Sequence, residues 1–534
     1  MAKVIFFEED ARQRVLKGAE IVYNAVKTTM GPKGRNVVIG KNYGIVVTHD
    51  GVTVAKAVEL PETEKTMGYK TGAELVKSAA LKMNDLVGDG TTTITVLAYH
   101  ILSEANKLIA AGHNPMELRK GLEAAKDAVL AGLGVISEDI SKDFDKLAQI
   151  ATISAGDKEI GKLIADVMKK VGKDGVVTVE ESQGVTLESE VVKGYTFDKG
   201  YISPYMISDQ ARGEAILEKP FILITDAKIR SVHDFLPLVE EMAKMGKKEL
   251  LIIAEDVEGE ALQTLVLNKL KGTFNTVCVK APSFGDFRKE TLNDLAILTG
   301  ATFVSEDQGM TLPITDVNVL GQARRVIIGR NETTIIEGAG AVEDIDLRVK
   351  QIEEQSKHAD SKYNESRYTQ RAAALGGKVA VIRVGGVTET EIEEKKFRVD
   401  DAVHAAKAAL AEGILPGGGV TMLYLADLLT NIDSGTALLI NALQKPFEIL
   451  LTNSGLKPDA YYEKLKDGKL GVNVNTGQVV DLKEAGIIDP TKVTKEAIMN
   501  AVSIAGTAIT MGALIVEEPQ KESAMPMPPM AGAM

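Results

Sequence analysis

The sequence predicts a multi-domain protein with mostly α-helical outer thirds and an α/β middle third built on a parallel sheet. Three observations carry this prediction. The 534 residues exceed what one hydrophobic core organises. Apolar residues recur at helical spacing near both ends of the chain, and short β-rich runs alternate with helix-length segments between them.

In the first third, two helices flank a glycine turn. Apolar positions recur from 75 to 87 and again from 94 to 109, with Gly88-Asp89-Gly90 between them. The last third repeats the pattern in an Ala-rich stretch at about 399–410 and in another at about 495–511. Both ends of the chain are therefore predicted to be helical.

The middle third contains four short runs that are rich in β-branched and aliphatic residues. These runs are Phe221–Thr225, Leu250–Ala254, Thr276–Val279 and Thr302–Ser305. Because helix-length segments separate them, they predict β-α-β units and a parallel sheet. The single cysteine, Cys278, is predicted to be a buried strand residue, and the charge-mixed stretch at 342–374 is predicted to be a surface helical hairpin.

Composition excludes several classes of protein. A net charge of −13 argues against a nucleic-acid binder, which usually carries a basic face. No stretch approaches the ~20 apolar residues of a membrane helix, and one cysteine cannot form an intrachain disulfide. We therefore expect no nucleic-acid or membrane partner and a cytoplasmic location. The Met- and Pro-rich stretch at 523–534 is predicted to lie outside the folded core.

The sharpest local motif is Gly88-Asp89-Gly90-Thr91-Thr92-Thr93. Its glycines let the backbone approach a ligand, and its threonines begin a helix whose free N–H groups favour an anion. A carboxylate beside a phosphate is repelled unless a cation bridges them, so Asp89 is interpreted as a Mg²⁺ ligand. A plain helix N-cap after a turn explains the same composition equally well.

Three other segments have related chemistry, and each is ambiguous alone. The loop at 28–36 pairs glycines with cations before a β run, which suits a phosphate cradle or a hairpin-entry turn. Asp50 adds a carboxylate in a turn. The triple glycine at 417–419 suits a surface for a nucleotide ring or a close helix crossing. No Walker-type or kinase motif is present in the sequence.

Together and in this order, the motifs closely resemble the group I (GroEL-type) chaperonins. They are GPKGRN at 31–36, DGV at 50–52, GDGTTT at 88–93, RVDDAVHA at 398–405, GGGV at 417–420 and GIIDPTKV at 486–493, together with LIIAEDVEGEAL at 251–262. The resemblance extends from about Ala11 to Val516. It implies an ATP-hydrolysing ring chaperonin that encloses non-native proteins and helps them fold.

The resemblance also implies three domains. The equatorial ATP-binding domain, mostly α-helical, would comprise 1–135 and 412–534. A small α/β intermediate domain would comprise 136–193 and 378–411. The α/β apical domain, with the parallel-sheet core, would comprise 194–377. Gly194 and Gly376-Gly377 at its ends are hinge candidates, although ordinary turn glycines explain them as well.

The family's site residues transfer to matching positions of this chain. Asp89 would hold Mg²⁺, and K⁺ is a candidate second cation. Asp401 would activate or orient the attacking water with Asp50 assisting, and it is preferred to Asp400 because it aligns with the family's aspartate before Ala-x-His-Ala. The nucleotide contacts would be Thr29, Met30, Gly31, Pro32, Asp89, Gly90, Thr91, Thr92, Thr93, Gly418, Asn473, Val474 and Asp489.

Two helical stretches in the middle third carry more apolar surface than one sheet can cover. The apolar residues of 232–245 spread over about 180°, and those of 262–270 over about 200°, whereas packing on a sheet requires about 100°. Either the helices are deeply buried or apolar side chains are left exposed. The resemblance favours exposure, for binding clients and then the co-chaperonin, at Tyr201, Tyr205, Met206, Leu236, Val239, Leu262, Val266 and Leu267.

The implied partners are non-native client proteins, a GroES-type co-chaperonin and further copies of the chain, in two stacked seven-membered rings. Three alternative functions differ in what they require. A metabolic ATP-dependent enzyme requires a polar second pocket in the middle third, for which the sequence offers no His/Asp/Cys cluster. A nucleotide-regulated scaffold would share the ATP motifs, and a group II-like chaperonin would work without a separate co-chaperonin.

Overall fold

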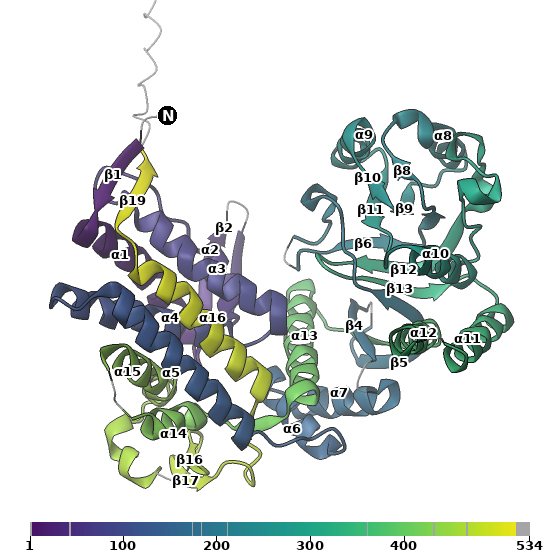
Figure 1. Cartoon of the computed structure of the whole chain (residues 1–534). Coiled ribbons are helices and arrows are strands. Elements are labelled where there is room, and N and C mark those ends of the chain that lie inside the picture. Colours follow the sequence, from purple (N-terminus) through teal and green to yellow (C-terminus); the bar gives the residue numbers. More distant parts are fainter. Residues whose placement is uncertain are drawn as a thin grey trace, which may run out of the picture. The chain divides into compact units, whose positions relative to one another are not determined.

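The computed structural model of the chain describes residues 3–41, 44–172, 175–182, 184–210, 212–359, 361–430, 433–465 and 468–518. The chain forms two compact units (Figure 1). Unit 1 comprises Met1–Lys169, Glu181–Leu187 and Val384–Met534, and unit 2 comprises Lys170–Glu180 and Glu188–Arg383. The stretch at 523–534, predicted to lie outside the core, falls outside the described residues.

Unit 1 is mainly helical, as predicted for both ends of the chain. Its helices are α1 (Glu8–Val26), α2 (Gly51–Ala57), α3 (Tyr69–Val87), α4 (Thr91–Ala110), α5 (Pro115–Ile136), α6 (Phe144–Ala155), most of α7 (Lys158–Val171), α13 (Glu389–Glu412), α14 (Val420–Leu428), α15 (Ser434–Asn453) and α16 (Thr491–Ile509). The long helices α4, α5 and α16 pack side by side (Figure 1). Their buried residues are mostly Ala, Val, Leu and Ile, and those of α4 and α16 lie in the two stretches with predicted helical spacing.

Small two-stranded sheets complete unit 1. The first and last strands, β1 (Lys3–Phe7) and β19 (Ala513–Glu517), pair antiparallel. A hairpin joins β2 (Val37–Lys41) to β3 (Gly44–Thr48). The other pairs are β15 (Ile414–Pro416) with β18 (Ile488–Pro490) and β16 (Leu470–Asn473) with β17 (Gln478–Asp481).

Unit 2 is built on a nine-stranded sheet in the order β11-β9-β7-β12-β13-β5-β14-β4, with β6 beside β12. Its strands are β4 (Val176–Glu181), β5 (Leu187–Phe197), β6 (Ala215–Glu218), β7 (Phe221–Ile224), β9 (Glu249–Ala254), β11 (Asn275–Lys280), β12 (Gly321–Ile328), β13 (Thr333–Gly338) and β14 (Lys378–Val384). The short strands β8 (Lys228–Ile229) and β10 (Asp256–Val257) pair separately. The helices are α8 (Leu236–Lys244), α9 (Gly259–Leu270), α10 (Asp286–Thr299), α11 (Val342–Lys357) and α12 (Lys362–Leu375).

The sheet of unit 2 is mixed. Strands β7, β9 and β11 are parallel and form the predicted β-α-β core, whereas β12 runs antiparallel to β7, β6 and β13. The predicted strand at 302–305 is reduced to one parallel bridge between Val304 and Thr225. Cys278 is fully buried in β11, where loss of solvent raises the pKa of its thiol. The predicted helical hairpin at 342–374 is present as α11 and α12.

Candidate functional site

The turn between α3 and α4 has the backbone shape that its glycines suggested. Gly88 and Gly90 both adopt left-handed conformations, with φ of 66° and 78°. No side chain caps the start of α4, so the N–H groups of its first turn remain available to an anion. Asp89, between the two glycines, is partly buried, and its carboxylate accepts a hydrogen bond from Gly90 N–H at 2.5 Å.

The N-terminus of α2 lies against the N-terminus of α4. A Cβ atom on Gly51 would lie 2.4 Å from Thr92 Oγ1 and 2.9 Å from Thr91 Oγ1, so only glycine fits this approach. The preceding residue, Asp50, is the N-cap of α2 and accepts from Val52 N–H at 3.2 Å, Thr53 N–H at 2.8 Å and Thr53 Oγ1 at 2.6 Å. The Asp50 carboxylate is therefore held in place by the helix that it caps.

The loop at 27–35 reaches the same place from α1. It begins with a short 3-10 helix, η1 (Lys27–Thr29), in which buried Thr29 donates its hydroxyl to Val26 O at 2.8 Å. The Oγ1 atoms of Thr29 and Thr92 are 3.3 Å apart. Two backbone bonds, Arg35 N–H to Thr28 O and Gly34 N–H to Gly31 O, close the loop. Segments distant in sequence thus bring Thr29, Gly51, Thr91 and Thr92 together.

The fourth component is the strand pair β15–β18. In this pair Asp489 lies opposite Leu415, and a Cβ atom on the adjacent Gly417 would come 2.9 Å from Asp489 Oδ1. Gly418 follows with φ 65° and has open space beside its Cα. Such a bare backbone surface can receive a flat ring.

The predicted residues Asn473 and Val474 lie on the β16–β17 hairpin. Asn473 accepts from Asn475 N–H at 3.1 Å through its side-chain oxygen, and Val474 is buried. Val472 of this hairpin shares a hydrophobic cluster with Val420, which follows the triple glycine.

Carboxylates dominate the electrostatics of this region. Burial raises the pKa of Asp489 to about 7, and repulsion from Asp89 contributes. Burial also raises the pKa of Asp89, with a further contribution from Asp50, although the hydrogen bond from Gly90 opposes the shift. The three carboxylates therefore lie close enough to repel one another, and perturbed acids of this kind mark functional sites.

Asp401 lies in the middle of α13. The side chain of Thr388 caps the N-terminus of this helix. A Cβ atom on Gly88 would lie 2.3 Å from His404 Cγ, so α13 contacts the α3–α4 turn at His404. Residues three apart share a helix face. Asp401, which is partly buried, is therefore on the face of α13 that meets the turn carrying Asp89.

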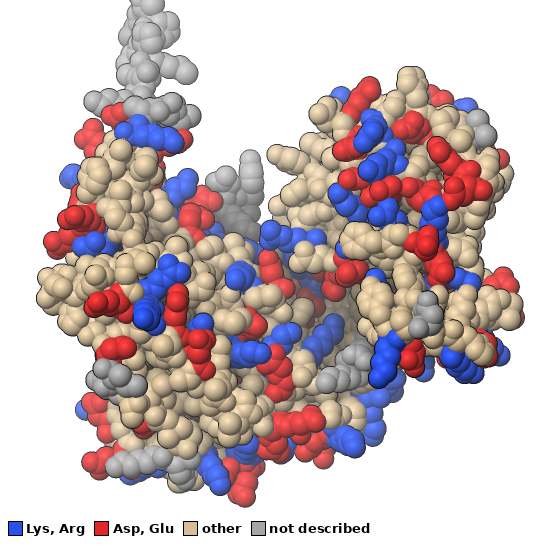
Figure 2. Space-filling view, viewed as in Figure 1, with Lys and Arg blue, Asp and Glu red and all other residues tan. Residues whose placement is uncertain are grey.

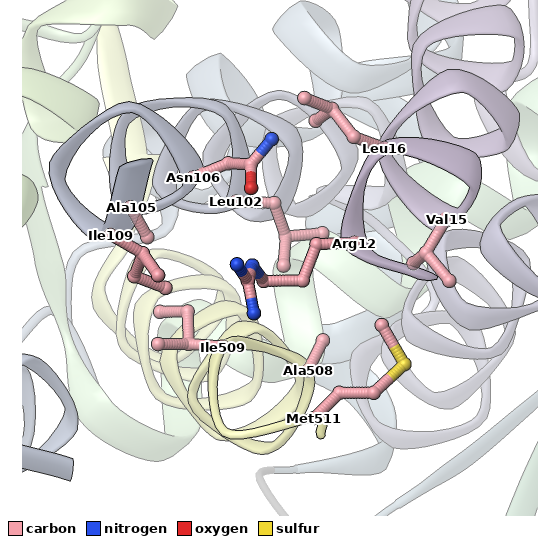
Figure 3. A pocket seen from close by; sticks show the side chains of 10 residues that line it. All are labelled: Arg12, Val15, Leu16, Leu102, Ala105, Asn106, Ile109, Ala508, Ile509 and Met511. Atoms are coloured by element: carbon pink, nitrogen blue, oxygen red, sulfur yellow. The ribbon is translucent and has the colours of Figure 1, made fainter. Parts of the chain in front are cut away.

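A cavity also lies within unit 1, but it contains none of these residues. It is lined by Arg12, Val15, Leu16, Leu102, Ala105, Asn106, Ile109, Ala508, Ile509 and Met511 (Figure 3). About 20 Å³ is accessible to the centre of a water molecule, which is room for one or two waters. The Arg12 guanidinium points among the apolar side chains (Figure 3). The cavity is too small for a nucleotide.

In unit 2, both predicted client-binding helices bury one face and expose apolar residues on the other. Leu238 and Met242 of α8 and Ala261 and Leu265 of α9 are buried. The exposed apolar residues are Leu236 (37%) and Met245 (53%) at α8, and Leu267 (55%) and Leu270 (63%) on α9. Uncharged surface lies over these helices between scattered charged side chains (Figure 2).

The other predicted client-binding residues have mixed exposure. Val239, Leu262 and Val266 are partly buried and pack against the core of unit 2, as does Tyr201. Tyr205 lies in a short 3-10 helix, η2 (Pro204–Met206), that contacts α9, and its side chain is 68% exposed.

The prediction for Met206 is wrong. Its side chain is fully buried, and its sulfur accepts the Cys278 N–H at 3.3 Å. The apolar side chain of Met206 belongs to the sheet core because η2 turns it inward while Tyr205 points outward. In this structure Met206 cannot touch a client.

Comparison with known proteins places these features in one family. The chain matches the model of the TCP-1/cpn60 chaperonin family over residues 22–519. The chain belongs to this chaperonin family. The predicted family is thereby confirmed, and membership supports a chaperone role.

A solved structure agrees with this chaperonin assignment. The chaperonin gp146 from the bacteriophage EL 2 (Pseudomonas aeruginosa), crystallised in the presence of ATP-BeFx, is similar with a TM-score of 0.68 and 21% identity. The match covers 97% of this chain and 100% of that one. At this identity the likeness is one of fold, and it confirms the predicted fold class.

The residues of this chaperonin fit a magnesium ion at Asp89. The mutual repulsion of Asp89, Asp489 and Asp50 is the situation that a bound cation relieves. Among the described residues, no three His, Cys, Asp or Glu side chains form a complete metal site. Mg²⁺ suits such a site because it is commonly bound by one or two carboxylates, with phosphate oxygens and water completing its shell. Of the described helices, none has the length and apolarity to cross a bilayer.

Proposed function

We propose that this chain is a subunit of a group I (GroEL-type) chaperonin that binds and hydrolyses ATP in unit 1 and captures non-native proteins on unit 2. One observation carries the nucleotide half of the proposal. The threonines at 29, 91 and 92 meet at Gly51 beside carboxylates whose pKa values are raised. Hydroxyl and N–H groups can donate to phosphate oxygens. A cation bound with the phosphates would compensate the charge of the neighbouring carboxylates.

Each group has a role that its position supports. The backbone of Thr29, Met30, Gly31 and Pro32 and the first turn of α4, with Gly90, Thr91, Thr92 and Thr93, would contact phosphates. Asp89 would hold Mg²⁺, which neutralises phosphate charge when bound, and K⁺ is a candidate second cation. Gly418, Asn473, Val474 and Asp489 would surround the adenine and ribose. Phosphoryl transfer depends mainly on such positioning and charge stabilisation.

Asp401 is the proposed catalytic carboxylate. The contact between His404 and Gly88 supports this role, because it brings the face of α13 that carries Asp401 to the α3–α4 turn. From there a carboxylate can orient water for in-line attack. Asp50 would assist from a fixed position, since its carboxylate oxygens accept hydrogen bonds from the N–H groups of Val52 and Thr53 at the start of α2.

The exposed apolar residues of α8, α9 and η2 support client capture. Tyr205, Leu236 and Leu267 are exposed by 68%, 37% and 55%, and Tyr201, Val239, Leu262 and Val266 are partly buried and pack against the core of unit 2. Exposed apolar patches of this kind mark interaction sites. A GroES-type co-chaperonin would later occupy the same surface and release the client into a closed chamber.

Assembly into rings is supported by the small sheets of unit 1. Val38 (62%) and Ile45 (71%) in the β2–β3 hairpin, and Phe7 (64%) and Ile515 (59%) in the β1–β19 pair, are exposed. Two-stranded sheets are marginal alone, and their unpaired edges invite pairing with another chain. We propose a homo-oligomer of two stacked seven-membered rings on this basis and on the family resemblance.

The domain division also belongs to this proposal. The equatorial (1–135 and 412–534), intermediate (136–193 and 378–411) and apical (194–377) assignment would allow nucleotide-driven movement at Gly194 and Gly377. These glycines are neighbours in the structure, since Gly194 N–H donates to Gly377 O at 3.3 Å. The cytoplasmic location expected from the sequence stays a prediction.

The proposal is tested by refolding a chemically denatured enzyme with the purified chain, with and without Mg-ATP and a GroES-type co-chaperonin. We expect capture without nucleotide and recovery of enzyme activity only when Mg-ATP is added. Electron microscopy of the same samples should show rings. Capture without ATP hydrolysis would contradict the ATPase half of the proposal, and ATP hydrolysis without capture would contradict the client half.

A further inference from the structure

The C-terminal end of α15 is tied to the loop at 27–35 by one side chain. Asn453, the last residue of α15, donates its Nδ2 hydrogens to Lys27 O at 2.9 Å and to Met30 O at 3.0 Å. Asn453 is partly buried and is separated from these residues by more than 400 positions in the chain. Nothing in the sequence around Asn453 indicates these partners.

The previous turn of α15 contacts the same loop. Leu450 lies against Gly31, where a Cβ atom would come 3.1 Å from Leu450 Cγ. Gly31 has φ 85°, so the close approach and the left-handed backbone coincide at one residue. Leu450 and Asn453 together form a platform on which the loop rests.

The hydrogen bonds of Asn453 also determine where the loop's N–H groups point. In a trans peptide unit the C=O and N–H bonds point in opposite directions. With Met30 O held toward Asn453, the N–H of Gly31 is directed away from α15, and the same holds for Thr28 N–H opposite Lys27 O. Gly31 is one of the residues expected to contact phosphate.

We propose that Asn453 is a positioning residue that holds this loop in the conformation that receives the phosphates of the nucleotide. The inference rests on the proposed nucleotide site, but Asn453 itself need not touch the nucleotide. A hydrogen-bond donor is required here because both partners are carbonyl oxygens, which accept but do not donate. An aspartate of the same shape would face two carbonyls with no donor.

The test measures MgADP affinity, the KM for ATP and kcat in variants of the full chain. In Asn453→Ala, we expect the Kd for MgADP and the KM to rise about tenfold while kcat stays within about twofold, because the loop binds the ground state and the transition state alike. Asn453→Asp should weaken binding further, and Asn453→Gln, which keeps the donors, should recover part of the affinity.

Ser454→Ala is the matched control. Ser454, which directly follows α15, is also partly buried, and its hydroxyl donates to Leu450 O at 2.8 Å. We expect its Kd for MgADP to equal that of the unmodified chain. A Kd within twofold of the unmodified value in both Asn453→Ala and Asn453→Asp would overturn the inference. If the unmodified chain bound no MgADP, the proposed nucleotide site would be wrong instead.

A measurement on the unmodified chain covers the case in which the variants do not fold. The amides of Gly34 and Arg35 close the loop through Gly31 O and Thr28 O. If Asn453 preforms the loop, these amides should exchange with solvent as slowly as those of the last turn of α15 before any nucleotide is added. Fast exchange that slows only with MgADP would overturn the inference.

Discussion

The turn at the start of α4 and the helices α8 and α9 depart from ordinary packing in opposite ways. At the turn, burial raises the pKa of Asp89 and of Asp489, and repulsion of Asp89 by Asp50 and of Asp489 by Asp89 adds to it. On α8 and α9, Leu236, Leu267 and Leu270 remain in water although their helices have a core to join. Each arrangement is unfavourable in the isolated chain, and under the proposed function each would be relieved by a partner of definite chemistry, a cation with phosphate in one case and an apolar peptide in the other.

The comparison teaches that the two sites fail differently when altered. Changes at the turn act on charge positioning and should alter turnover with little effect on the fold. Changes on the exposed face of α8 and α9 should alter capture alone. Changes to buried core residues, which belong to neither site, should alter stability.

The largest expected effect is on turnover. Asp401→Ala should lower kcat by about a thousandfold while MgADP affinity is kept, because in the proposed mechanism the carboxylate acts on the attacking water and not on the bound nucleotide. Steady-state ATPase and calorimetric binding measure the two quantities. Asp400→Ala, the neighbouring position, is the control and should retain turnover. Normal kcat in Asp401→Ala would remove the catalytic assignment.

The next effect is on stability in unit 2. Met206→Ala should destabilise this unit by about 3 kcal/mol, because it leaves a cavity in a fully buried site. Tyr205→Ala, next to it but 68% exposed, should change stability by no more than about 0.5 kcal/mol. Thermal unfolding of both variants measures the contrast. Equal losses would show that η2 does not separate a core residue from a surface residue.

The next effect is a loss of stability at acid pH that comes from a histidine of unit 1. His100 is partly buried, its Nε2 lies 3.1 Å from Tyr23 Oη, and burial together with nearby lysines lowers its pKa from 6.5 to about 4. Because the folded state disfavours the protonated ring, its stability falls as the pH drops below 6.5. From pH 6.5 to 5 the loss is about 2 kcal/mol.

The measurement compares His100→Gln with the unmodified chain by thermal unfolding at pH 7 and pH 5. Between pH 7 and pH 5, the variant should lose less stability than the unmodified chain, because it lacks the histidine that is protonated on unfolding. His113→Gln, at an exposed position, is the control for the general effect of replacing a histidine with glutamine. A parallel pH response in His100→Gln and the unmodified chain would contradict the prediction.

The smallest expected effect is on client affinity. Leu267→Glu places a charge on the exposed face of α9 and should weaken capture of a denatured protein by about tenfold, since the charge must be desolvated against an apolar peptide. ATPase and unfolding temperature should stay unchanged because Leu267 is 55% exposed. Gln263→Glu adds the same charge at another exposed position of α9. Equal capture by Leu267→Glu and Gln263→Glu would show that the apolar character of this face does not matter.

Local sequence predicted much of the fold because its patterns are periodic. Apolar spacing placed α4 and α16 within four residues of their bounds and found the end of α3, which begins six residues before the predicted start, and the β-rich runs placed β7, β9 and β11. The antiparallel strands β12 and β13 were not predicted. The run at 302–305 forms only a single bridge, because the β propensity of a segment does not determine whether it pairs with a neighbouring strand.

At the candidate site, the sequence by itself identified the residue types and their turns. Gly88 and Gly90 bracket Asp89 in the left-handed conformations that glycine allows, and Thr91 begins a helix there. The surplus apolar residues of α8 and α9 were also evident from their angular spread. These features depend on residues only a few positions apart, so periodicity and backbone preference are enough to find them.

Tertiary structure decided which of these residues meet and which side chains stay exposed. The contacts of Thr29 with Thr92, of His404 with Gly88 and of Asn453 with Lys27 each join segments far apart in the chain. Whether Met206 or Tyr205 faces solvent depends on how η2 packs on β11 and α9. Such contacts follow from packing whole elements together, a property that no short window of sequence contains.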